Sequence, residues 1–176
     1  MKYRLRRTLS SQFATYEELC TLLAKIEACL NSRTLCALAD DRFNPTYLSP
    51  GHFLISEPLT QLPAANFTDV KCNRLSRWQT HPQNLQQFWQ RWSSEYLQGL
   101  HRRQRWLRTS PNLQPGDFVL LIEDNTAPLH WPTAIITDIH PGKNGIVRVV
   151  TISNTKIVFK RPIIKIFPLP RVNSEL

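Results

Sequence analysis

The sequence predicts an α+β protein in which helices come first and a small all-β module follows. Residues 112–170 contain five short runs of β-branched and aromatic residues, and turn signals separate these runs. Residues 16–31 and 82–108 instead repeat apolar residues at three- and four-residue steps, which is the period of a helix with one buried face. The apolar fraction of 41% in 176 residues indicates an ordered chain that can build one good core or two small ones.

The first helix is expected from Tyr16 to Asn31. Thr15 stands three residues before Glu18, which matches the capping box that often starts a helix. Residues 1–9 are expected to be the last turns of an earlier helix, and residues 44–70 a connector of short extended pieces. The apolar stripe that the first helix should bury consists of Leu19, Leu22, Leu23, Ile26 and Leu30.

A second helix is expected over residues 82–108, with Pro82 as its first residue because proline suits that position. Residues 71–108 hold eight Lys or Arg residues against the single acid Glu95, and the whole chain carries a net charge of +9. A segregated basic stretch points to a polyanion such as DNA. A solvated helix face explains the same stretch equally well.

Tryptophans within this basic stretch can act as stacking platforms for bases. Trp89 and Trp92 share the apolar stripe of the helix, so we expect them in the core. Trp106 lies among arginines, and there burial is favoured over base stacking by a smaller margin. Trp78 precedes the predicted helix.

The β module is expected to contain strands at residues 113–120, 131–139, 146–152, 156–160 and 163–167. Asn144-Gly145 is the strongest hairpin signal. Lys156 and Lys160 alternate with Ile157 and Phe159, so the lysines should face outward and the apolar pair inward. Such a module is expected to be a small closed barrel or a strongly twisted sheet, because closure hides the strand edges.

Four segments of this module carry a resemblance to a known family: residues 115–120, 129–132, 140–145 and 147–151. In order and spacing they resemble the C-terminal domain of the integrase of Pao/BEL-type LTR retrotransposons. Residues 26–35 are similar to the closing helix of the catalytic core of the same integrases. The resemblance implies an RNase H-like core remnant at residues 1–60, a connector at 61–81, a basic helix at 82–108, an SH3-like β-barrel at 112–170 and a tail at 171–176.

The resemblance also implies a DNA-associated role without catalysis. The complete enzyme of that family would use Mg²⁺ held by two Asp and one Glu, and the positions that match this set fall upstream of Met1. Glu27 is therefore expected to be a helix-surface or capping acid, and no cofactor, metal or catalytic residue is expected here. The residues expected to contact DNA, largely without sequence preference, are Arg74, Arg77, Arg91, Arg102, Arg103, Arg105, Arg108, Lys156, Lys160, Arg161 and Lys165.

Two other functions stay open at this point. A barrel of this kind can bind a histone tail or another peptide in an aromatic cage, and the aromatic residues available here are Phe118, Trp131, Phe159 and Phe167. Most of these side chains are expected to be buried in the core. The chain can also serve as an oligomerisation piece, or join an integrase partner, through apolar surface in residues 1–60.

No signal peptide and no apolar run long enough to span a bilayer is visible, so we expect the nucleus or cytoplasm and no membrane partner. The four cysteines have neither metal-binding spacing nor a disulfide pattern, and we expect ordinary thiols.

Overall fold

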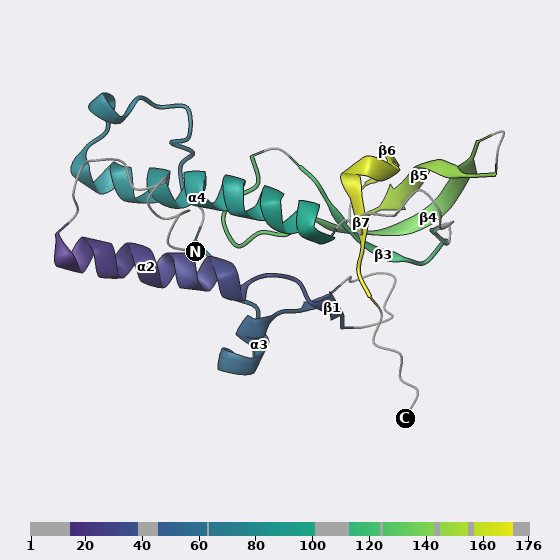
Figure 1. Ribbon diagram of the computed structural model, residues 1–176, viewed down its shortest axis with the longest axis horizontal. Helices are drawn as coiled ribbons and strands as arrows, with labels where there is room; N and C mark the ends of the chain where they lie inside the picture. The colour runs from purple at the N-terminus through teal and green to yellow at the C-terminus, as the bar shows by residue number, and fades with distance from the viewer. Residues whose placement is uncertain are drawn as a thin grey trace. The chain divides into compact units, whose positions relative to one another are not determined.

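The computed structural model describes residues 15–38, 46–62, 64–100, 113–123, 125–142, 145–154 and 157–170 (Figure 1). These residues form three α-helices, a two-stranded sheet and a five-stranded antiparallel sheet, so the predicted α+β class is confirmed. The chain divides into two compact units, one made of Met1–Arg33, Pro50–Glu95 and Asn125–His130 and the other of Thr34–Ser49, Tyr96–Asp124 and Trp131–Leu176.

Helix α2 (Tyr16–Asn31) has the bounds that the sequence predicts. The expected capping box closes its N-terminus. Glu18 N donates to Thr15 Oγ1 over 3.4 Å, and Thr15 N donates to Glu18 Oε2 over 2.8 Å. Two backbone N–H groups that the first turn leaves unpaired are thereby satisfied.

The buried face of α2 is narrower than predicted. Leu22 and Ile26 are buried as expected, and Cys29 continues their line one turn further on. Leu23 is 40% exposed, so its place in the predicted stripe is wrong. Residues 22, 26 and 29 follow the i, i+4, i+7 spacing of a single helix face, and residue 23 lies about 100° away from that line.

Helix α3 (Pro50–Ile55) corrects the prediction of extended pieces over residues 44–70. Ser49 followed by Pro50 is a usual start signal, because proline at the first helical position gives up an N–H that has no partner there. Gly51 is the buried residue of this helix. A Cβ at that position would lie 2.9 Å from Leu59 Cγ, so glycine allows the close approach of the following chain.

Helix α4 (Arg77–Leu100) begins earlier than the predicted start at Pro82. Gln79 N donates to Ser76 O over 2.9 Å, and Ser76 N donates to Gln79 Oε1 over 3.0 Å, which closes the first turn. Pro82 lies inside the helix, where its ring removes one backbone hydrogen bond. The predicted continuation to Arg108 and the predicted helix at residues 1–9 lie outside the described residues.

In the first unit α2 and α4 lie side by side with their first turns at the same end, and both bury apolar side chains (Figure 1). Trp89 and Trp92 are 0% and 6% exposed, so their predicted place in the core is confirmed. The rings of Phe88 and Trp92 stack at 6.5 Å, and Trp89 Nε1 donates to Thr126 Oγ1 over 3.2 Å. The indole N–H thus has a partner in a buried site.

The second unit is built on the five-stranded sheet, in the order β6-β5-β4-β3-β7. The predicted closed barrel is wrong, because β6 and β7 are the two edges of this sheet and do not pair. The predicted strand at 163–167 begins as a 3-10 helix, η2 (Ile163–Lys165), which leaves only a short β7. The strands are β3 (Phe118–Leu121), β4 (Thr133–Pro141), β5 (Val147–Ser153), β6 (Val158–Pro162) and β7 (Ile166–Pro168).

One core cluster of the second unit lies on one face of this sheet, and Phe118, Leu120 and Phe167 are buried on the other face. Ile136 and Ile152 face each other across β4 and β5 and are almost fully buried. Phe159 packs against this core, as predicted, whereas Ile157 is 65% exposed and the prediction that it faces inward is wrong. Ile157 precedes Val158, the first paired residue of β6, so no strand pairing holds it over the core.

A second, two-stranded sheet in this unit pairs β1 (Cys36–Ala37) with β2 (Tyr47–Leu48). Ala37 N donates to Pro170 O over 3.2 Å, which connects this pair to the chain just after β7. The last turn of α4 also belongs to this unit. Tyr96 Oη donates to Thr34 O over 2.6 Å, and its ring meets Trp131 edge-on at 5.5 Å.

Candidate nucleic-acid interface

Three cations and a tryptophan, all exposed, lie within residues 71–78, where the connector leads into α4. Lys71 and Arg74 begin and end the 3-10 helix η1 (Cys72–Arg74), as its N-cap and its last residue. Arg77 and Trp78 are the first two residues of α4. All four side chains are exposed. We call Lys71, Arg74, Arg77 and Trp78 the basic corner.

Glutamines on α4 hold the chain before the basic corner against the helix. The buried Gln83 donates through Nε2 to Phe67 O and Val70 O over 2.9 and 2.6 Å. Gln86 accepts from Phe67 N over 2.9 Å and donates to Ala65 O over 2.8 Å. These bonds satisfy backbone groups that a loop would otherwise leave unpaired. They also fix the entry into η1, and with it the positions of Lys71 and Arg74.

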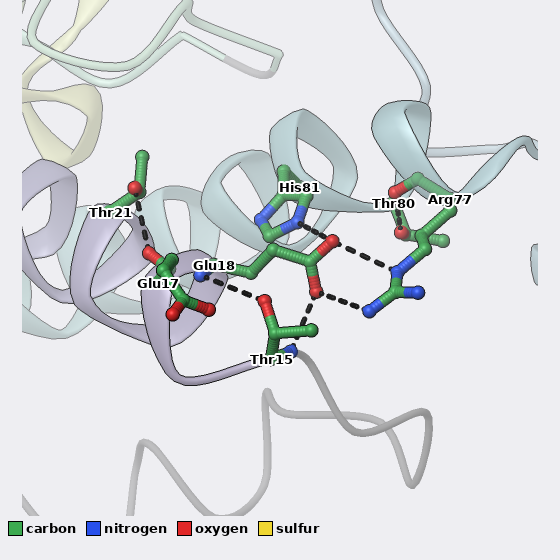
Figure 2. Close-up of polar contacts among 7 residues, drawn as sticks. All are labelled: Thr15, Glu17, Glu18, Thr21, Arg77, Thr80 and His81. Carbon is green, nitrogen blue, oxygen red and sulfur yellow. Dashed lines mark hydrogen bonds and ion pairs between the residues drawn. The ribbon is translucent and has the colours of Figure 1, made fainter.

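Glu18 on α2 orients the start of α4 (Figure 2). Its Oε1 lies 2.9 Å from Arg77 Nε and 3.6 Å from His81 Nε2. The hydrogen bond from Arg77, followed by the one from the backbone N–H of Thr15, lowers the pKa of Glu18 from 4.5 to about 2. Arg77 is therefore partly neutralised. Lys71 and Arg74 form no ion pair within the described part of the chain.

Trp78 completes the basic corner with an aromatic surface. It is 80% exposed, and its ring centroid lies 6.4 Å from that of His81. Its position explains the exposure, because it precedes the apolar stripe that buries Leu85, Phe88 and Trp89. Ser76 followed by Gln79 has the spacing of a capping box, and this is the signal in the sequence that points to a helix start before Pro82.

The remaining predicted contacts of the basic helix are not gathered at this corner. Arg91 is exposed further along α4, and at 1.5 Å per residue it lies roughly 20 Å from Arg77 along the helix axis. The other predicted arginines of this stretch and one predicted lysine lie outside the described residues. They are Arg102, Arg103, Arg105, Arg108 and Lys156.

In the second unit the predicted cations lie on β6 and η2. Lys160 and Arg161 are neighbours on a strand and therefore point to opposite faces of the sheet. Arg161 is half-buried, with its guanidinium 5.2 Å from the centre of the Phe159 ring and 4.0 Å from Glu123 Oε1. Lys160 and Lys165 are exposed. The structure thus leaves two of the three cations open to an external anion.

A separate hollow of about 420 Å³ lies in the first unit beside α4. Amide side chains dominate its polar lining, among them Gln61, Gln86, Gln90 and Asn125. Gln61 Oε1 is buried there without a hydrogen-bond partner. Among the described residues that line the hollow there is no lysine, arginine or acid, so their chemistry suits neutral polar groups rather than phosphates.

Other ligand chemistry has little support in the described residues. They contain no group of three metal-ligating side chains, and Glu27 is exposed on α2. All four cysteines are free thiols, and burial raises the pKa of Cys29 to about 12. No helix in the described part of the chain is long and apolar enough to span a bilayer.

Fold and site together describe an α+β protein with an exposed basic and aromatic corner on its first unit. Residues 76–169 match the model of a family of unknown function, DUF5641, and the chain belongs to this family. The match begins at the residue before α4 and ends just past β7, so the helix and the five-stranded sheet are matched as one sequence. No curated protein and no solved structure matches the chain.

Proposed function

We propose that this chain is a catalytically incomplete part of a Pao/BEL-type retrotransposon integrase and that it binds DNA with little sequence preference. The basic corner is the observation that carries the DNA-binding proposal. It presents three cations on exposed side chains, and two of them have no acidic partner in the described part of the chain. The resemblance of residues 115–151 and 26–35 to the integrase supports the retrotransposon origin, with α2 as a remnant of the catalytic core.

Phosphate contacts account for the expected lack of sequence preference. The guanidinium of Arg74 offers a planar fork of donors that matches a phosphate, and Lys71 offers a point charge. Such contacts fix the position of the backbone but do not read the bases. Each neutralised phosphate releases counterions, so affinity should fall steeply as salt rises.

The aromatic-cage alternative has little support in the second unit. Phe118, Trp131 and Phe167 are all at most 5% exposed, so they fill the core. Phe159 is half-buried and already lies beneath the guanidinium of Arg161. A cage for a methylated lysine needs several exposed aromatic faces that converge on one point.

The test is fluorescence anisotropy of the full chain with a labelled random duplex, from low to above physiological salt. We expect binding with a steep salt dependence. Lys71→Ala/Arg74→Ala should weaken binding and reduce the slope of log K against log salt by about 2. The matched control is Lys25→Ala/Arg148→Ala, which removes one lysine and one arginine from exposed positions elsewhere and should change the slope little.

Two results would contradict this proposal. Absence of duplex binding by the unaltered protein at low salt would remove DNA as the partner. Equal losses in the corner variant and the control would show that net charge, not the basic corner, drives binding. In that case Lys160→Ala/Lys165→Ala is the next variant, since these are the open cations of the second unit.

Self-association is a second candidate, and a surface of α3 favours it. Phe53, Leu54 and Ile55 are 74%, 66% and 56% exposed and follow one another in the chain. Contiguous exposed apolar side chains mark interaction surfaces. Sedimentation velocity across a range of concentrations tests this. Association that Phe53→Ser removes and Leu62→Ser leaves unchanged would support it, since Leu62 is exposed outside α3.

A further inference from the structure

Trp78 differs from the other tryptophans of the described chain. Trp89, Trp92 and Trp131 are at most 6% exposed, whereas Trp78 is 80% exposed. Burying an aromatic side chain is among the largest favourable terms in folding. Folding buries little of the Trp78 ring, so the faces of the indole remain available to a ligand.

Contacts made by residues close to Trp78 hold the helical turn that carries it. It lies on the first turn of a 24-residue helix, next to Arg77. Glu18 holds Arg77 by a short ion pair and approaches His81 (Figure 2). The centroid of the His81 ring lies 6.4 Å from that of the Trp78 ring. A rigid aromatic anchor loses little conformational entropy when a ligand stacks on it. The turn that carries this indole is therefore fixed before any ligand arrives.

The charges around Trp78 identify the class of ligand. Arg77 is the adjacent residue, and Arg74 and Lys71 stand four and seven residues earlier in the chain, so a partner that meets the indole also meets positive charge. An apolar protein surface would gain nothing from these cations. A single strand of nucleic acid offers both matching groups, since each nucleotide has an exposed base face and a phosphate. A duplex offers its phosphates but keeps its base faces stacked inside.

We infer that the basic corner is a binding site for single-stranded nucleic acid, with Trp78 as the platform on which one base stacks and Lys71 and Arg74 as phosphate contacts. This inference rests on the proposed function and specifies its substrate class. Stacking is tolerant of sequence because every base has an aromatic face. The site should therefore prefer unpaired strands, such as frayed or single-stranded ends, over intact duplex without preferring a sequence.

The test compares a labelled mixed-sequence single strand with the duplex of the same length, at one salt concentration, by anisotropy. The unaltered protein should bind the single strand more tightly. Trp78→Ala should weaken single-strand binding about tenfold or more, and by a larger factor than it weakens duplex binding. Trp78→Phe, which keeps an aromatic face, should retain most of the affinity. Lys71→Ala/Arg74→Ala should weaken both complexes.

A second readout follows the indole itself. Stacking of a base on Trp78 should quench part of the tryptophan fluorescence, and Trp78→Phe should lose that part. Circular dichroism and thermal melting confirm that the variants fold, which the exposure of Trp78 leads us to expect.

The possible outcomes distinguish failure of the single-strand inference from failure of the proposed DNA binding. If the unaltered protein binds neither strand form, the proposed function fails as well. If it binds duplex with a steep salt slope but Trp78→Ala changes single-strand and duplex binding equally, or neither, only the stacking inference is overturned. It is also overturned if Trp78→Ala abolishes self-association in sedimentation while nucleic-acid binding stays unchanged, which would assign the ring to a protein partner.

Discussion

Glu18 Oε1 lies 2.9 Å from Arg77 Nε, and this contact joins the first turn of α2 to the first residue of α4 across 59 positions of sequence. The same carboxylate accepts from Thr15 N over 2.8 Å. One side chain therefore completes the cap of one helix and orients the start of another. Its charge sets how both should respond to acid.

The first prediction concerns the pH dependence of stability. The pKa of Glu18 is lowered from 4.5 to about 2 in the folded protein, first of all by Arg77. A lowered folded-state pKa means that the carboxylate contributes stability above about pH 4.5 and loses it as the pH falls toward 2. In Glu18→Gln this contribution is absent at every pH. Urea midpoints measured between pH 7 and pH 2 should therefore fall less in this variant than in the unaltered protein.

Glu17→Gln is the control for this measurement. Glu17 is exposed on the same turn, and no ion pair joins it to Arg77 in the described chain (Figure 2). This variant should keep the acid dependence of the unaltered protein. Identical acid dependence in Glu18→Gln and the unaltered protein would argue that the ion pair does not persist in solution.

The second prediction compares two glycines in helices. Gly51→Ala places a Cβ 2.9 Å from Leu59 Cγ and 3.4 Å from Asn31 O, so neighbouring atoms must move. Overpacking of this kind costs about 1–3 kcal/mol. Gly99→Ala meets nothing within 4 Å and should stabilise α4 by about 0.5–1 kcal/mol, because alanine favours the helix. Thermal melts should shift in opposite directions, and a stabilising Gly51→Ala would contradict the close packing of Leu59.

The third prediction concerns two isoleucines in the second unit. Ile152 is 0% exposed and faces Ile136 across the sheet, so Ile152→Ala should cost about 2–5 kcal/mol of unfolding free energy. Ile157 is 65% exposed, and Ile157→Ala should stay within about 0.5 kcal/mol. Chemical denaturation of the two variants checks this. Similar large losses in both would support the inward position that the alternation of residues 156–160 predicts for Ile157.

Much of the local structure could be predicted from the sequence. The bounds of α2 and its cap follow from Thr15 and Glu18, because both signals act over four residues. The hairpin between β4 and β5 was predicted from Asn144-Gly145, and Gly145 has the positive φ of 73° that favours glycine. The burial of Trp89 and Trp92 follows from helical spacing alone.

What the sequence could not supply depends on contacts between distant segments. Closure of the sheet requires β6 to pair with β7, and strand propensity does not decide whether η2 intervenes. The engagement of Arg77 by Glu18 is invisible in a pattern of charges. The exposure of Trp78 does not follow from the sequence either, because Pro82 is a stronger helix start signal than Ser76 and places Trp78 before the predicted helix.

The open sheet has a consequence for handling the protein. An unpaired outer strand can recruit the same strand of another molecule, and repeated recruitment leads to fibrils. Strand β6 carries two features that oppose this growth: the exposed charge of Lys160, which repels its own copy, and Pro162, which has no N–H to donate. Salt screens the charge but leaves the proline unchanged. Concentrated samples should therefore resist aggregation better at low ionic strength.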